Sequence, residues 1–339
     1  MTVLELQDAR PTLADVARAA GVSPATASRV INGFQRVRPE TRRQVEAAIV
    51  DLGYVRQRAA KTTLRTRTGS VAVVVCEEAL RLFADPAFGR VLWGASQVLA
   101  PSGHQVVLLM AQSAKDAQSI VKYLRGGHVD GALVVSLQAR YAVPLDRVPV
   151  PIVSAGRPRC AEDCSYVDAD NRGGAERAAR HLLAAGRTRI ATIAGPKDVP
   201  LAAARFAGFR SVLTEQGRFE PGLVAYGDFS QACAEHLTLR LLERRPDLDA
   251  IFAASDQMAI GALRALRRTG RKVPDDVAVI GFGNSPLARS TKPPLTTVKA
   301  PIEAIGAHAA RELLAQLAGN STQPRHITLN TELVIRESA

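Results

Sequence analysis

The polar side chains between Ser23 and Asn32 are the group in this 339-residue chain whose types and spacing are best suited to chemistry. Thr26, Ser28 and Asn32 offer hydroxyl and amide groups, and Arg29 lies among them. All four can hydrogen-bond to phosphate oxygens or to the edges of bases. The guanidinium of Arg29 also has the reach and the parallel donors that fit O6 and N7 of guanine. This segment is therefore a candidate for contact with nucleic acid.

Three short helices are expected over residues 12–54 to position these side chains. The first is capped by Thr12, with Asp15 where a capping box places its acid. The second opens on Ser23-Pro24, with serine as the cap and proline at the first helical position. The third begins near Pro39. The residues expected to be buried follow helical spacing in each helix: Leu13, Val16, Ala17 and Ala20; Ala27, Val30 and Ile31; Val45, Ala48, Ile49 and Leu52.

Two short helices joined by a turn containing Gly21 have the outline of a helix-turn-helix, and a purely structural helical hairpin has the same outline. The distribution of charge separates the two. The chain has 44 Lys and Arg against 32 Asp and Glu, a net charge of +12. Residues 1–69 hold 12 basic and 6 acidic residues, so half of the excess lies in about a fifth of the chain. Such concentrated positive charge is what binding to phosphates requires.

The segment from Thr12 to Tyr54 resembles, without a gap, the DNA-binding headpiece of the lactose-repressor/galactose-repressor (LacI/GalR) family of bacterial transcription regulators. The resemblance implies a homodimer whose two headpieces read adjacent halves of a pseudo-palindromic operator. The later sequence LRLFADPAF is similar to an actinobacterial-type subgroup of the family.

The resemblance assigns DNA contacts to positions along the first two helices. Arg29 matches a base-contacting arginine, and Pro24 and Ala25 match the positions where the family varies its base-reading side chains. An apolar pair there can meet thymine methyl groups but offers little hydrogen-bond readout, so Arg29 and the linker should carry more of the specificity. The remaining expected DNA-binding residues of the headpiece are Thr12, Ser23, Thr26, Ser28 and Asn32.

Residues 55–69 are basic and rich in hydroxyl groups, and are expected to form a hinge linker. In the family a proline and an asparagine usually occur here, and a short hinge helix inserts a leucine into the minor groove. Arg56-Gln57 replace that pair, and Leu64 comes one residue later than the pattern predicts. Leu64 is the candidate wedge, and the alternative is that it packs against the C-terminal domain.

From residue 70 to 339 short aliphatic runs alternate with amphipathic segments, which predicts an α/β fold of doubly wound, largely parallel sheets. About 270 residues suffice for two such lobes, with a ligand site between them at the carboxyl ends of the strands. The domain resembles the periplasmic-binding-protein-like sensor of the same family, with the chain crossing between lobes. The expected strands are 71–75, 106–110, 131–135, 150–153, 190–194, 250–254 and 277–281; the expected helices are 88–100, 116–126, 172–185, 202–216, 230–245 and 257–269.

An enzyme is not expected. The sequence lacks the glycine-rich phosphate-binding motifs, the G-x-S-x-G elbow and H-E-x-x-H. Cys160 and Cys164 have no second ligand pair and are interpreted as incidental thiols. Asp168 and Asp170 are explained by an extended segment or a helix cap. We therefore predict no catalytic residues, no metal and no cofactor.

The resemblance implies an effector site of aromatic rings and planar polar groups, which suit sugars. The matching positions are Phe88, Arg157, Asp168, Arg205, Phe229, Ser255, Asp256 and Asn284. Alternatives remain: both phenylalanines suit an ordinary core, and Asp256 could cap the following helix. Arg205 is the firmest assignment, as an arginine near a strand end in an apolar setting.

Two positions depart from the family pattern. Gly283-Asn284 stands where G-[FY]-D-D has its carboxylates, and Gly156-Arg157 stands where many members have Asp-Arg. The site is therefore less acidic, and the effector could be a sugar or oligosaccharide, or instead a nucleobase, a phosphosugar or a protein co-regulator.

The sequence as a whole predicts a repressor of sugar uptake or breakdown genes. There is no basic-then-apolar leader and no apolar run long enough for a membrane span, so a cytoplasmic, nucleoid-associated protein is expected rather than an exported solute carrier. The chain ends soon after residues 333–336 without a heptad segment, which favours a dimer over a tetramer.

Overall fold

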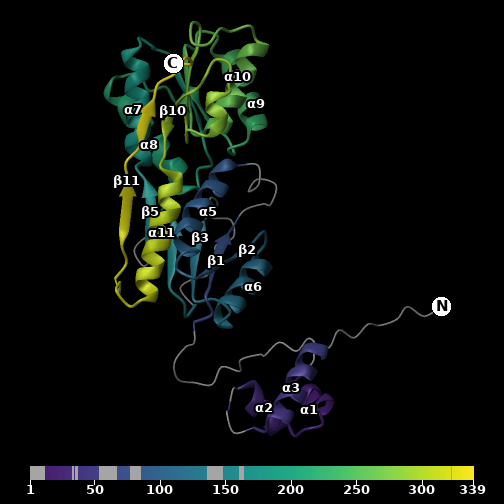
Figure 1. Cartoon of the computed structure of the whole chain (residues 1–339). Helices are drawn as coiled ribbons and strands as arrows, with labels where there is room; N and C mark the ends of the chain where they lie inside the picture. The colour runs from purple at the N-terminus through teal and green to yellow at the C-terminus, as the bar shows by residue number, and fades with distance from the viewer. Residues whose placement is uncertain are drawn as a thin grey trace, which may run out of the picture. The chain divides into compact units, whose positions relative to one another are not determined.

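The computed structural model describes residues 12–32, 34, 37–52, 67–76, 85–135, 148–159, 164–321 and 323–339. The chain divides into two compact units, residues 1–66 and 67–339 (Figure 1). The second unit begins three residues before the boundary expected at residue 70: the backbone N–H groups of Thr68 and Gly69 donate to the Asp130 carboxylate at 2.7 and 2.8 Å.

The first unit contains three helices, α1 (Leu13–Ala19), α2 (Pro24–Ile31) and α3 (Pro39–Leu52). The expected caps are confirmed: Thr12 and Asp15 form a capping box, and the Ser23 hydroxyl accepts from the N–H of Thr26. The prediction that Leu52 is buried is wrong, since its side chain is 38% exposed in the last turn of α3. The buried core residues are Val16, Ala17, Ala27, Val30, Val45 and Ala48.

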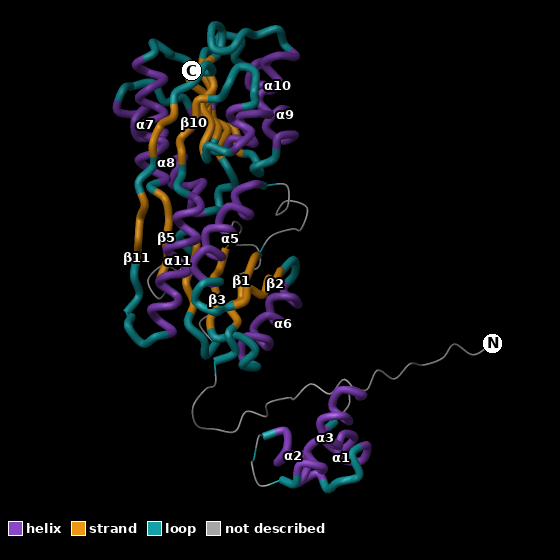
Figure 2. The backbone as a smooth tube through the Cα atoms, viewed as in Figure 1, coloured by secondary structure: helices purple, strands orange, loops and turns teal. Residues whose placement is uncertain are grey.

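The second unit consists of two α/β lobes, as predicted (Figure 2). The sheet of the first lobe has the order β11-β5-β4-β3-β1-β2, and every pairing in it is parallel. Its elements are β1 (Ser70–Val75), α5 (Pro86–Leu99), β2 (Gln105–Met110), α6 (Ala114–Arg125), β3 (Gly131–Val135), β4 (Ile152–Ala155), β5 (Ser165–Ala169), α11 (Ile302–Leu317) and β11 (His326–Leu329).

The sheet of the second lobe has the order β12-β10-β9-β8-β6-β7, and only the edge strand β12 runs antiparallel. Its elements are α7 (Asn171–Ala184), β6 (Ile190–Ala194), α8 (Pro200–Glu215), η3 (Pro221–Leu223), β7 (Val224–Tyr226), α9 (Gln231–Arg244), β8 (Ala250–Ala253), α10 (Asp256–Arg268), β9 (Ala278–Phe282), η4 (Pro286–Arg289), β10 (Thr296–Lys299) and β12 (Glu332–Val334).

The chain crosses between the lobes three times: between β5 and α7, between β10 and α11, and between β11 and β12. Consequently α11 returns to the first lobe, where it packs against α5 and covers β3, β4 and β5 (Figure 1). All seven expected strands and six expected helices of this unit are present, and no end is shifted by more than two residues. Sequence reasoning did not foresee β5, β7, β10, β11, β12 or α11.

Gly94 of α5 allows α5 and α11 to approach closely, and it supports a first prediction. A Cβ atom at Gly94 would lie 1.9 Å from the backbone oxygen of Glu303, a group that cannot rotate away. We expect Gly94→Ala to lower the free energy of unfolding by about 3 kcal/mol, because the two helices must separate.

Gly89→Ala is the matched control on the same helix, because a Cβ there has no neighbour within 4 Å. Its higher helix propensity should raise the free energy of unfolding by about 0.5–1 kcal/mol. Urea unfolding followed by circular dichroism measures both variants. Equal stabilities of the two variants would contradict the close packing of α5 on α11.

Candidate DNA interface and effector site

The surface of α2 presents the residues predicted to contact DNA. Ser23, Pro24, Ala25, Arg29 and Asn32 are exposed, whereas Ala27 and Val30 of the same helix are buried in the three-helix core. Thr26 and Ser28 are half-buried at the border. The helix therefore has one face available to a partner.

Most polar groups of this surface already have an intramolecular partner. The Ser23 and Thr26 hydroxyls are 2.9 Å apart. The Asn32 side-chain amide donates to the Ser28 backbone oxygen at 2.7 Å and to its hydroxyl at 3.1 Å. Among the described residues the Arg29 guanidinium has no such partner, so it is the group freest to read a base. Leu64, the candidate wedge, lies outside the described residues.

Thr12 fills a structural position at the start of α1. Its hydroxyl donates to the Asp15 carboxylate at 2.6 Å and accepts from the Asp15 N–H at 3.3 Å. The hydrogen bonds that the hydroxyl and the backbone N–H of Thr12 donate to the Asp15 carboxylate hold the pKa of Asp15 below its ordinary value. The cap fixes the beginning of α1, against which α2 packs.

In the second unit, Arg205 is the centre of a polar network. It lies on α8 rather than at a strand end, which corrects the local setting expected from the sequence. Its Nε donates to the Asn171 side-chain oxygen at 2.9 Å, and its Nη1 donates to the backbone oxygen of Ala254, just beyond β8, at 2.6 Å. The guanidinium carbon lies 3.7 Å from the centroid of the Phe282 ring. The guanidinium is thus fixed by two hydrogen bonds and a cation–π contact.

Carboxylates from both lobes surround this guanidinium. Burial lowers the pKa of Arg205 to about 10, and the charges of Asp168, Asp256 and Asp85 oppose that shift. Asp85 and Asp168 belong to the first lobe and Asp256 to the second. The predicted site residues Asp168, Arg205 and Asp256 therefore interact, and they do so where the carboxyl ends of the two sheets face each other.

Asp256 is the most deeply buried of these acids, with only 2% of its surface exposed. It accepts hydrogen bonds from the Thr297 hydroxyl and from the backbone N–H of Ser285. The cap of α10 is Ser255, whose hydroxyl accepts from the N–H of Met258 at 3.2 Å. Asp256 is thus a member of the network rather than the helix cap.

The Asp168 carboxylate lies at the end of β5 and accepts from the Asn171 amide at 3.0 Å and the Ala169 N–H at 2.8 Å. The Arg157 side chain is exposed, and the Arg157 backbone N–H opposes the rise that burial causes in the pKa of Asp168. Asp170, two residues on, caps α7, as one of the sequence alternatives predicts.

The aromatic candidates occupy different environments. Phe88 is 5% exposed and belongs to the main apolar core, as expected for an ordinary core phenylalanine. Phe229 is half-buried, and its backbone has φ of 68°, a strained conformation for a bulky residue. A Cβ at Gly195 would lie 2.5 Å from the Phe229 ring, so this ring lies directly against the end of β6.

Asn284 connects to the network through its backbone. Its N–H donates to the Thr297 hydroxyl oxygen at 3.3 Å, and its side-chain oxygen accepts from Arg336 at 2.7 Å. The side chain is therefore already paired. The neighbouring Gly283 has φ of 126°, a conformation that an aspartate would adopt only with strain.

Comparison with known proteins identifies the group to which this architecture belongs. The model of "Bacterial regulatory proteins, lacI family" matches residues 12–57, and that of "Periplasmic binding protein-like domain" matches residues 179–339. The HTH-type transcriptional regulator CelR of Thermobifida fusca is 44% identical over 334 residues, 97% of this chain and 98% of that protein. The chain belongs to the lacI family of bacterial regulatory proteins.

Further similarities within the lacI family extend over nearly the whole chain. The ribose operon repressor of Halalkalibacterium halodurans is 32% identical over 96% of each chain. A solved complex of the transcriptional regulator CelR with cellobiose has a TM-score of 0.78 and 43% identity, covering 97% of this chain and 100% of that one. A lac repressor dimer bound to operator and the anti-inducer ONPF has a TM-score of 0.72 and 27% identity, over 97% and 99%.

These findings confirm the predicted fold and class of function: this lacI-family chain is a DNA-binding transcriptional regulator and not an enzyme. In the part of the chain that the structure describes, no cluster of three metal-ligating side chains occurs. None of the described helices combines the length and apolarity needed to cross a bilayer.

Several members of the network were not found by sequence reasoning. Asn171 links Asp168 to Arg205, and Thr297 links Asp256 to Asn284. Arg90 of α5 forms a two-point ion pair with Glu303 at 2.6 and 3.0 Å and donates to the Gly283 backbone oxygen of the second lobe at 3.0 Å. The polar residues of the VDADN segment (167–171) were a sequence signal that could have indicated Asn171. No pattern in the sequence around Arg90 indicates its contacts.

The buried acids make stability dependent on pH. Burial raises the pKa of Asp256 above its ordinary value, with hydrogen bonds from Thr297 and Ser285 opposing the rise. The folded state therefore binds more protons than the unfolded state just above the ordinary pKa, so this group's contribution to stability falls as the pH rises through that window.

Asp256→Asn should remove that contribution, because an amide does not ionise and the Thr297 hydroxyl can accept from it instead of donating. We expect the free energy of unfolding of the variant, relative to that of the unmodified protein, to increase as the pH rises above the ordinary pKa of an aspartate. Urea unfolding at a series of pH values measures the difference. A difference that does not vary with pH would show that Asp256 does not titrate as proposed.

Proposed function

We propose that this regulator is a homodimeric repressor that binds a pseudo-palindromic operator in the bacterial nucleoid, and that cellobiose or a similar oligosaccharide held between the two lobes controls it. The observation that carries the effector assignment is the Arg205 network, where planar guanidinium, amide and carboxylate groups from both lobes converge. Such groups grip pairs of sugar hydroxyls. The cellobiose complex of CelR, at 43% identity, supports the choice of sugar.

Each segment of the chain has its own proposed role. Residues 12–54 form the headpiece, residues 55–69 the hinge, and residues 70–339 the effector-binding and dimerisation domain. Arg29 reads bases, with Pro24, Ala25, Thr26, Ser28 and Asn32 around it, and Thr12 and Ser23 contribute at the starts of α1 and α2. The proposed effector contacts are Phe88, Arg157, Asp168, Arg205, Phe229, Ser255, Asp256 and Asn284.

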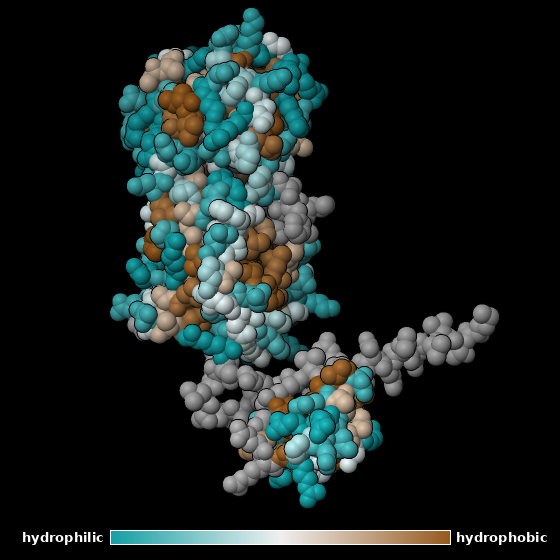
Figure 3. Space-filling model, in the orientation of Figure 1, coloured by the Kyte–Doolittle hydropathy of each residue, from teal (hydrophilic) through white to brown (hydrophobic). Residues whose placement is uncertain are grey.

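A homodimer would also cover apolar surface on the first lobe. Trp93 of α5 is 58% exposed and Leu108 of the edge strand β2 is 38% exposed. Figure 3 shows apolar residues gathered over this lobe. Exposed apolar area of this kind is typical of an association surface.

Effector control would act through the lobes. The Arg90 contact to Gly283 and the charges around Arg205 join groups of both lobes, so a ligand that binds them favours one lobe arrangement over another. If that arrangement alters the two linkers of the dimer, the operator affinity changes by at most the difference between the ligand's binding free energies for the two arrangements.

The test begins with an operator selected by the full-length protein from random DNA. Fluorescence anisotropy then measures operator affinity with and without cellobiose, ribose, cytidine and glucose 6-phosphate. We expect cellobiose to change the affinity at least about tenfold and the affinity to fall steeply with salt. A response to cytidine or glucose 6-phosphate instead of cellobiose would overturn the sugar assignment and favour the nucleobase or phosphosugar alternative.

The proposed hinge supports a separate prediction. Leu64→Ala should weaken operator binding by about 1–3 kcal/mol if the leucine unstacks a base step. Thr63→Ala is the control one position away, with no apolar wedge to lose. Anisotropy with the selected operator measures both, and unchanged affinity of Leu64→Ala would remove the wedge from the mechanism.

A further inference from the structure

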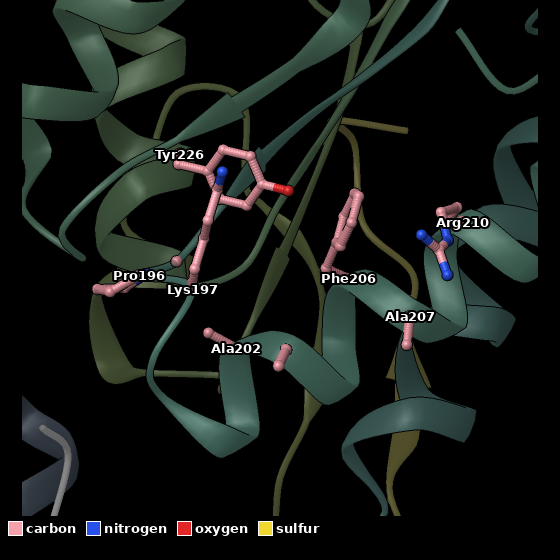
Figure 4. A pocket seen from close by; sticks show the side chains of 9 residues that line it. Pro196, Lys197, Ala202, Phe206, Ala207, Arg210 and Tyr226 are labelled. Atoms are coloured by element: carbon pink, nitrogen blue, oxygen red, sulfur yellow. The ribbon is translucent and has the colours of Figure 1, made fainter. Parts of the chain in front are cut away.

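A cavity lies on the second lobe, apart from the Arg205 network. It has a volume of about 300 Å³ and lies between the ends of β6 and β7 and one face of α8 (Figure 4). Its size falls at the lower end of the range of small-molecule sites. None of the effector residues proposed above lines it.

Two aromatic rings form its walls. Tyr226 ends the edge strand β7 and is 40% exposed, which leaves its ring available. The Phe206 ring meets it edge-on, with 5.8 Å between ring centroids. Between them the helix presents only alanine methyl groups, from Ala202, Ala203 and Ala207, so the space beside the rings stays open.

Two cations border the same space. The Lys197 ammonium lies 4.3 Å from the centroid of the Tyr226 ring, and the Arg210 guanidinium lies 5.7 Å from that of Phe206. Both side chains line the cavity, and no described carboxylate does. Lys197 and Arg210 are also exposed, and within the described residues neither forms an ion pair. The cavity therefore carries positive charge at two places on its border, with the two aromatic rings between them (Figure 4).

We propose that this cavity is an accessory site for a small organic phosphate that carries a ring, such as a nucleoside monophosphate or a sugar phosphate. The phosphate would bind Lys197 or Arg210 at the border of the cavity by charge-assisted hydrogen bonds. The ring would lie against Tyr226 and Phe206.

The accessory site shares a wall with the effector region. Gly195 and Ala202 line the cavity, and a Cβ at Gly195 would lie 2.8 Å from the Ala202 methyl and 2.5 Å from the Phe229 ring. A ligand in the cavity thus lies one layer of atoms from a proposed effector contact.

Isothermal titration calorimetry on the full-length protein without DNA tests the site, with adenosine 5′-monophosphate, ribose 5-phosphate and adenosine as probes. We expect adenosine 5′-monophosphate to bind and the double variant K197Q/R210Q to bind it at least about tenfold more weakly. The matched control K272Q/R264Q also removes two exposed positive charges from this lobe and should bind it as the unmodified protein does. Ala203→Trp, which fills the cavity without changing charge, should abolish binding.

The remaining outcomes are decisive as well. Binding of ribose 5-phosphate as tight as that of the nucleotide supports the site and makes a sugar phosphate its ligand, whereas weak binding of both adenosine and ribose 5-phosphate makes it a nucleotide site. Retained nucleotide binding in Arg205→Met separates the cavity from the effector site. Absence of phosphate binding in the unmodified protein, or equal loss in K197Q/R210Q and K272Q/R264Q, overturns the proposal.

Discussion

Arg205→Met should lower the affinity for cellobiose at least about a hundredfold, roughly 3 kcal/mol. Arg205 donates to Asn171 and to the Ala254 carbonyl, and its charge offsets those of Asp168 and Asp256. Methionine keeps much of the volume over Phe282 but leaves these acceptors unpaired. The buried acids then repel any hydroxyl acceptor brought into the site.

The same substitution should lower the free energy of unfolding by about 2–4 kcal/mol, because two buried carboxylates lose a neighbouring cation. Titration calorimetry with cellobiose measures the loss of affinity, and urea unfolding measures the loss of stability. Arg205→Lys restores the charge without the planar fork, so it should recover stability more than affinity. Arg264 is exposed on α10, and Arg264→Met is the control, which should change neither the affinity for cellobiose nor the stability. If Arg205→Met is destabilised yet binds cellobiose normally, Arg205 has only a structural role.

Arg29→Ala should weaken binding to the selected operator by about 10- to 100-fold, or about 1–3 kcal/mol. Arg29 is exposed on α2, and no described residue engages its guanidinium, whereas Asn32 and Ser28 are hydrogen-bonded to each other. A bidentate contact to guanine would be lost together with the discrimination at that base pair.

Measuring the affinity for random DNA as well as for the operator distinguishes a base contact of Arg29 from a contact with phosphate. Arg29→Ala should bind random DNA only slightly more weakly than the unmodified protein, because it loses a single positive charge. Arg43→Ala, exposed on α3, removes the same charge away from α2 and should leave the preference for the operator intact. A proportional loss on operator and random DNA in Arg29→Ala would make Arg29 a phosphate contact.

Features determined by neighbouring residues were predictable from the sequence. The capping box of Thr12 and Asp15 and the serine cap at Ser23 depend on residues three positions apart, and both are present. Strands buried on both faces, such as Ser70–Val75, are marked by unbroken aliphatic runs. The strands β5 and β10 were not predicted because Asp168, Thr296 and Thr297 interrupt the apolar pattern at positions that serve the polar network.

The network itself could be predicted only in part. The resemblance pointed to Asp168, Arg205 and Asp256, but the partners that fix them come from distant parts of the chain. Asn171 lies 34 residues before Arg205, and Thr297 lies 41 residues after Asp256. Such pairings depend on how α7, α8, α10 and β10 are arranged around the second sheet, which no local pattern encodes.

The three crossings of the chain between the lobes also affect the order in which its parts can fold during synthesis. The last strands of the chain, β11 and β12, complete the edges of the two sheets, and the buried Ser338 binds Val279 and Thr296 of the second lobe. Neither lobe can finish folding until β11 and β12 have left the ribosome, whereas the helices of the headpiece precede these strands in the chain. A truncated product would therefore expose two open sheet edges, and a message cut short would yield a chain able to present α2 without an intact sensor.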